Sequence, residues 1–112
     1  MCVISSNANA QRGFLGGETK VDRFFVQSNG KAFVGLDGDL PANACSFFQY
    51  YFNFDSTTEV GKNLLSVVMT AQVSKSTVNI WYIHSVAEAG TDQTNGCGQN
   101  NMAVLDAIGL RN

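Results

Sequence analysis

The stretch TTEVGKNLLSVVMTAQVSKSTVNIWYI, residues 57–83, decides the fold. Its first part carries apolar side chains from Val60 to Ala71 at the spacing of one helical face, which predicts an amphipathic helix. Ser56 and Glu59 stand in the S-x-x-E relation of a capping box, so the helix is expected to begin at about residue 57. The apolar pattern ends near residue 74, where we expect the helix to stop.

Two segments beside this helix alternate in a way that predicts strands. Residues 77–85 place Val78, Ile80 and Tyr82 on one face, and Asn79 and Trp81 on the other. Residues 46–55, SFFQYYFNFD, alternate more strictly still. One face of this second segment is wholly aromatic and must be buried, and its members are Phe48, Tyr50, Phe52 and Phe54.

Three further segments are predicted to be strands. Residues 20–27 and 32–38 are rich in β-branched and aromatic side chains, and Asn29-Gly30 between them is a strong hairpin signal. Gly35 inside the second of them suggests a bulge or a sharp bend. Residues 102–110 form the last predicted strand, with a short helix as the alternative. The resulting order is strand, strand, strand, helix, strand, strand.

This order predicts a mainly β fold with one helix (α+β). Specifically, it is the order of a five-stranded OB-fold-like barrel with the helix between the third and fourth strands. Residues 20–112 are expected to form this single domain, and residues 1–19 an export-signal remnant or a flexible N-terminal segment. The tripeptide at residues 8–10, Ala-Asn-Ala, fits a signal-peptidase site, and a disordered polar N-terminus is the alternative.

The three cysteines predict one disulfide and one remaining thiol. Cys2 lies in the unusual N-terminal segment, so Cys45 and Cys97 are the natural pair. In the OB-fold order the third and fifth strands run parallel and side by side, and each cysteine precedes one of them. Their Cα atoms could therefore meet at one rim within the distance of about 7 Å that a disulfide requires.

The composition limits the classes of function. Charged residues make up only 14% of the 112 residues and the formal net charge is −2, a balance common in secreted or periplasmic proteins. A mildly acidic chain lacks the concentrated positive charge that nucleic-acid binding requires. No apolar run approaches the roughly 20 residues of a membrane span. His84 is the one histidine, and no spacing of residues indicates a nucleophile, a metal site or a cofactor, so no enzymatic activity is expected.

Ligand binding has more support. The second face of residues 46–55 offers Gln49, Tyr51 and Asn53, and the matching face of residues 77–85 offers Asn79 and Trp81. Flat aromatic rings beside amides suit sugars, which stack on rings and hydrogen-bond to amides. The alternative is that these aromatic rings pack under the helix or at a subunit contact. The polar loop at residues 91–101 is the other candidate for recognition.

The stretch LLSVVMTAQVSKSTVNIWYI, residues 64–83, together with a cystine that ties the strands, resembles the B subunits of pentameric bacterial toxins of the subtilase-cytotoxin and pertussis-toxin type. The resemblance covers residues 20–110 and rests on element order and cysteine placement. It implies an exported OB-fold domain that forms a homo-oligomer, such as a pentameric ring, and recognises a glycan or another cell-surface ligand. The alternative is an envelope structural or inhibitor-like domain that binds a protein partner.

Overall fold

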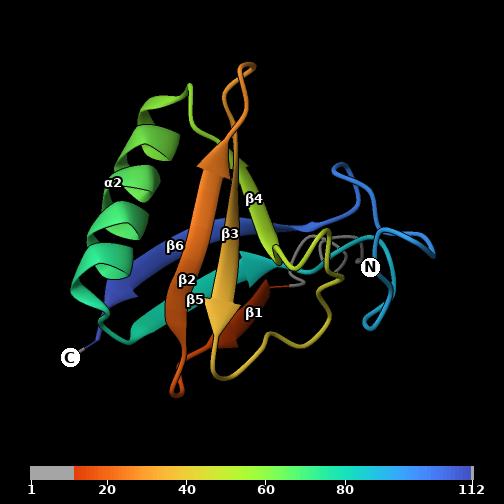
Figure 1. Ribbon diagram of the computed structural model, residues 1–112, viewed down its shortest axis with the longest axis horizontal. Helices are drawn as coiled ribbons and strands as arrows, with labels where there is room; N and C mark the ends of the chain where they lie inside the picture. The colour runs from red at the N-terminus through yellow and green to blue at the C-terminus, as the bar shows by residue number, and fades with distance from the viewer. Residues whose placement is uncertain (1–11, 112) are drawn as a thin grey trace, which may run out of the picture.

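The computed structural model describes residues 12–111, in which six strands and one helix form a mainly β fold (Figure 1). The elements are β1 (Arg12–Leu15), β2 (Lys20–Val26), β3 (Lys31–Asp37), β4 (Phe52–Asp55), α2 (Glu59–Ser74), β5 (Val78–Ile83) and β6 (Ala103–Leu110). The expected signal site at residues 8–10 and Cys2 lie outside the described residues. The helix α2 and the strands β5 and β6 agree closely with the predicted segments.

The strands form one mixed sheet in the order β1-β5-β6-β4-β3-β2. All neighbours are antiparallel except β4 and β6, which run parallel, as predicted for the third and fifth strands. The sheet has six strands rather than five and is not closed, since β1 and β2 stand at its two ends. The start of β2 contacts the start of β5: the Val78 amide donates a hydrogen bond of 3.0 Å to the Thr19 carbonyl, and Lys20 pairs with Thr77.

The strand β1 lies in the segment that sequence analysis assigned to a flexible N-terminus. Its four residues pair with β5, with Phe14 opposite Trp81. A segment this short and glycine-rich carries little strand signal of its own. The glycine is nevertheless required at position 13, because a Cβ atom there would lie 2.4 Å from Cζ of Tyr82. Pairing with β5 therefore makes this segment a strand.

The core lies between the inner face of the sheet and α2. Fully buried side chains come from β3, β4 and β5, and they include Ala32, Val34, Phe52, Val78 and Ile80. The helix adds Val68 and Ala71, two members of the predicted apolar stripe. Each large aliphatic or aromatic side chain buried in this way stabilises the fold by about 1.5–3 kcal/mol.

The helix begins with a different cap from the predicted one. Thr58 is the N-cap residue, and its hydroxyl accepts a hydrogen bond of 2.9 Å from the Gly61 amide. Ser56, predicted to cap the helix, instead donates its hydroxyl to the carbonyl of Gly30. The hairpin turn at Gly30 lies close enough to take this hydroxyl, and no local sequence signal records that proximity.

The aromatic strand predicted at residues 46–55 is only half formed, which is a correction. Only Phe52–Asp55 is a strand, and residues 47–50 form a tight turn in which Phe47 and Tyr50 exchange two backbone hydrogen bonds of 2.9 Å. Phe48 and Gln49 have φ of 52° and 69°. The ring of Phe48 is consequently 58% exposed, although alternation predicted it to be buried.

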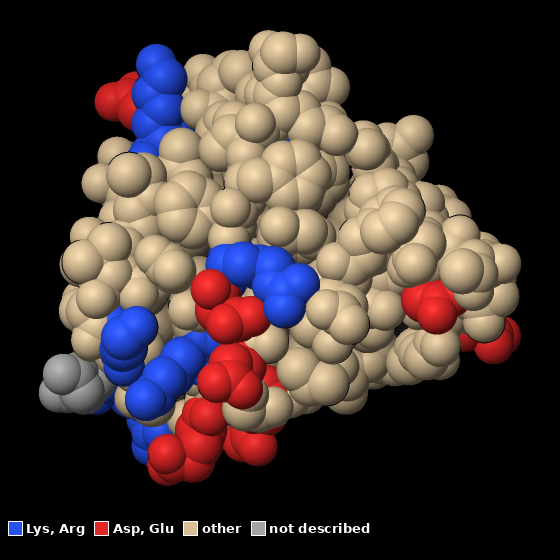
Figure 2. Space-filling model, in the orientation of Figure 1, with Lys and Arg blue, Asp and Glu red and all other residues tan. Residues whose placement is uncertain are grey.

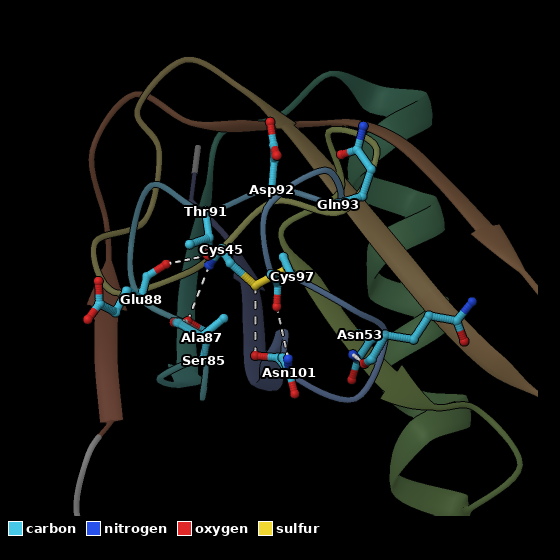
Figure 3. Close-up of a disulfide and its surroundings, with 12 residues drawn as sticks. Cys45, Asn53, Ser85, Ala87, Glu88, Thr91, Asp92, Gln93, Cys97 and Asn101 are labelled. Carbon is cyan, nitrogen blue, oxygen red and sulfur yellow. Dashed lines mark hydrogen bonds between the residues drawn. A yellow bond between two sulfur atoms is a disulfide. The ribbon is translucent and has the colours of Figure 1, made fainter.

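The Cys45–Cys97 disulfide holds the β5–β6 connection on the outer face of the sheet (Figure 3). The two Cα atoms are 5.9 Å apart, which confirms the predicted pairing at one rim. Both cysteines are buried in a second apolar cluster with Phe33 and Met102. In Figure 1 this connection lies on the opposite side of the molecule from α2. The domain therefore has a small second core beneath this loop.

Candidate functional site

The five residues predicted to bind a ligand do not form one surface. Asn79 and Trp81 share the outer face of β5, as predicted. Gln49 lies in the exposed turn, where its Oε1 accepts a hydrogen bond of 3.1 Å from the guanidinium of Arg23. Tyr51 packs against the main core and borders a separate hollow of about 270 Å³.

Asn53 was predicted to contact a ligand, but the structure buries its side chain. Its side chain was expected on a face open to solvent, but it is 7% exposed. Its Nδ2 donates a hydrogen bond of 2.7 Å to the Gln99 carbonyl in the loop that the disulfide holds. Asn53 therefore anchors this loop to β4 and is not available to a ligand.

Trp81 lies at the centre of a candidate binding surface. Its ring centroid lies 4.8 Å from that of Phe14, at an interplanar angle of 48°. Phe14 is 56% exposed, and Trp81 and Asn79 are partly exposed. We refer to Phe14, Asn79, Trp81 and Gly109 as the Trp81 platform. Sequence analysis missed Phe14, because its place beside Trp81 depends on the pairing of β1 with β5.

The neighbouring strand β6 leaves this platform uncovered. Trp81 is paired with Ala107 and Asn79 with Gly109, so small residues flank the ring and the amide. A Cβ atom on Gly109 would meet no atom within 4 Å, which shows open space above it. Among residues 12–111, the Asn79 side chain forms no hydrogen bond, so its amide can serve a ligand. The Arg12–Asp106 ion pair joins β1 to β6 across β5.

A larger hollow of about 430 Å³ lies at the rim beside His84. Asn43 and the segment 84–89 line it. The hydroxyl of Ser85 donates to the Ala87 carbonyl and accepts a 3.2 Å hydrogen bond from the Cys45 amide. This serine is thus engaged in holding the loop.

In Figure 2 the upper part of the face in view is largely uncharged, while most blue and red atoms lie side by side in its lower half and a further pair lies at the upper left. Lys20 and Lys75 border one hollow together with Asp22 and Asp37. This mixture of signs gives no concentrated positive surface for phosphates.

In the described part of the chain, no group of acidic, histidine and cysteine side chains could hold a metal ion. The helix α2 is not long and apolar enough to cross a membrane, and it is the one helix among the residues described.

The titratable groups with shifted pKa values have structural roles. The hydroxyl and amide of Thr57 donate to Asp55 and lower the pKa of its carboxyl group, and Thr94 does the same for Asp92. Burial raises the pKa of Tyr82, whose hydroxyl donates to the Ala42 carbonyl at 2.6 Å. None of these three groups belongs to the Trp81 platform.

Comparison of the chain with models of known protein families, with curated proteins and with solved structures finds no match. The function must therefore be argued from the site itself.

Proposed function

We propose that this protein is an exported binding module that recognises a glycan or another cell-surface ligand through the Trp81 platform. The observation that carries the proposal is the partly exposed Phe14–Trp81 pair beside the unengaged amide of Asn79. An aromatic ring offers a flat apolar surface to the C–H face of a sugar, and an amide offers both a donor and an acceptor to its hydroxyl groups.

The sheet order supports an OB-fold-like barrel whose first strand is interrupted. If β1 and β2 are counted as one strand broken at residues 16–19, this strand pairs with β5 at one end and with β3 at the other. The hydrogen bond between Val78 and Thr19 continues the contact across the interruption. Domains of this class often bind oligosaccharides or oligonucleotides. This chain has only seven Lys and Arg residues and a formal net charge of −2, which favours an uncharged oligosaccharide over a negatively charged oligonucleotide.

The disulfide supports export, because disulfides persist mainly in oxidising compartments. An oligomer, such as a pentameric ring, would increase affinity by presenting several platforms to one cell surface. Presenting several platforms matters because a single stacked aromatic ring contributes only about 0.5–1.5 kcal/mol beyond its buried area. Light scattering on a size-exclusion column, with and without reductant, tests the assembly. A monomer under both conditions would remove the multivalent part of the proposal.

A glycan array followed by titration calorimetry tests the platform. Trp81→Ala should weaken binding of the best array ligand by roughly tenfold, corresponding to about 1.4 kcal/mol. Phe48→Ala is the control, because it removes an exposed aromatic ring, 58% exposed against 56% for Phe14 of the platform, from the turn at residues 47–50. Equal losses from both variants, or no glycan bound by the unmodified protein, would contradict the proposal.

A protein partner is the second candidate function, and one surface favours it. Val73 is 78% exposed on α2, and Met69 and Leu110 lie partly exposed nearby. A hollow of about 240 Å³, lined in part by Thr70 and Leu110, separates the helix from the end of β6. Exposed apolar surface of this kind is typical of protein contacts. A Val73→Asp variant that abolishes binding to a protein partner while glycan binding persists would favour this candidate.

A further inference from the structure

The described chain contains two Asn-Gly pairs, Asn29-Gly30 and Asn95-Gly96, and the structure places them in different environments. Asn-Gly is the dipeptide most prone to cyclise, because glycine has no side chain to hinder the approach of its amide nitrogen to the asparagine side chain. Both asparagines are exposed, so exposure alone does not distinguish them. The hydrogen bonds of the glycine amides do.

The hairpin pair is held in place. The Gly30 amide donates a hydrogen bond of 2.9 Å to the Gln27 carbonyl. A Cβ atom on Gly30 would lie 2.2 Å from Cγ2 of Thr57, so this backbone is also closely packed. The Asn29 side-chain oxygen accepts from the Lys31 amide at 3.0 Å. The attacking nitrogen is therefore engaged, and cyclisation requires the hairpin turn to open first.

The loop pair is not held in this way. No described residue accepts a hydrogen bond from the Gly96 amide, and a Cβ atom on Gly96 would meet nothing within 4 Å. The Asn95 side-chain oxygen accepts a hydrogen bond from the Asp92 amide, as that of Asn29 does from the Lys31 amide, so the difference between the two sites lies in the glycine amides. Gly96 has φ of 131°, a conformation open to glycine in particular.

From this contrast we infer that Asn95 is a site of spontaneous deamidation, whereas Asn29 is protected. The Gly96 nitrogen forms a bond to the side-chain carbonyl carbon of Asn95. The bond from this carbon to the side-chain nitrogen breaks, and ammonia leaves with the proton that the Gly96 amide has lost. Water then opens the cyclic imide at either carbonyl and yields aspartate or isoaspartate at position 95. Water is the one co-reactant, and no oxidant or enzyme is needed.

The modification changes the charge of the loop that the disulfide holds. It adds one negative charge to a chain whose formal net charge is −2, within three residues of Asp92. Isoaspartate would also lengthen the main chain between Asp92 and Cys97, whose amide donates to the Asp92 carbonyl at 2.9 Å. The affected surface is the outer end of this loop, so the Trp81 platform on β5 should keep its ligand affinity.

The test compares the two sites in the same molecule. Native protein is aged at mildly alkaline pH, and peptide mapping by mass spectrometry follows Asn29 and Asn95. We expect Asn29 to react roughly five- to tenfold more slowly than Asn95, the protection that one hydrogen bond confers. In guanidinium chloride the two rates should converge, because both glycine amides are then free. Equal rates in the native protein, or a faster reaction at Asn29, would overturn the inference.

Two variants give a second readout by ion exchange. Asn95→Gln should prevent most of the acidic form, since the longer side chain cyclises less readily, and Asn29→Gln should lower its rate of formation only slightly. The Asp37-Gly38 pair can also form a cyclic imide, but its opening restores a carboxylate and adds no charge. An acidic form that accumulates undiminished in Asn95→Gln would assign the modification elsewhere and refute the inference.

Discussion

Removing the Cys45–Cys97 disulfide should destabilise the domain chiefly through the unfolded state. The two cysteines are 52 residues apart in sequence. In the chain-entropy model, a closed loop of this length restricts the unfolded chain enough to stabilise the fold by about 4 kcal/mol. In the folded state the loop keeps other anchors, among them the Ser46 amide, which donates to the Thr91 carbonyl at 3.0 Å. The double variant Cys45→Ala/Cys97→Ala should therefore fold to the same structure with lower stability.

Such a loss is large beside the total stability of a small domain, which is about 5–15 kcal/mol. It corresponds to a fall in Tm of roughly 15–30 °C for a domain of this size. Urea unfolding followed by circular dichroism measures the free energy directly, and the slope m should rise because the unfolded chain exposes more surface without the cross-link.

The experiment is best performed in a Cys2→Ala background, so that no third thiol exchanges with the pair. Fully reduced protein with both cysteines intact is the control for the lost sulfur atoms, and its stability should lie close to that of the double variant. A loss below about 1 kcal/mol, with m unchanged, would refute the argument from loop closure.

Three further predictions concern single side chains. Asn53→Leu leaves the Gln99 carbonyl without its buried donor and should cost about 1–3 kcal/mol in urea unfolding. Thr58→Ala removes the helix cap and should cost about 1 kcal/mol, measured by thermal unfolding. Burial raises the pKa of Tyr82 above its ordinary value of 10.0, so the unfolded state loses the phenol proton first. The stability that this group contributes should be intact below pH 10.0 and fall as the pH rises through the folded pKa. Tyr82→Phe should abolish this decline, which urea unfolding at alkaline pH measures. The variant also loses the hydrogen bond to the Ala42 carbonyl, which should lower the stability by about 1 kcal/mol.

Much of the secondary structure was predictable because the decisive signals are local. The helix α2 and the strand β5 follow from side-chain periodicity within residues 57–83, and the β2–β3 hairpin follows from Asn29-Gly30. The break at residues 47–50 had no such local signal, since Phe48 and Gln49 carry no preference for positive φ. Their turn packs against Gly35 on β3, where a Cβ atom would lie 3.2 Å from the Gln49 carbonyl oxygen.

The candidate site was predictable in the same partial way. Alternation correctly placed Asn79 and Trp81 on one face of β5. It could not supply Phe14, which reaches Trp81 only because β1 pairs with β5. It also could not show that Gln99 covers Asn53, because alternation assigns a residue to a face without saying what lies over that face.

The sequence by itself determined the elements whose signals lie within a few residues of each other, namely the helix, the strand after it, the hairpin, and the faces that α2 and β5 turn inward. Only the tertiary structure decided that β1 exists as a strand, that the aromatic segment breaks before Phe52, and that Trp81 rather than Asn53 remains open to a ligand. The physical reason is that periodicity records which side of an element is apolar. Whether the other side is covered depends on segments distant in the chain, here β1 and the loop that the Cys45–Cys97 disulfide holds.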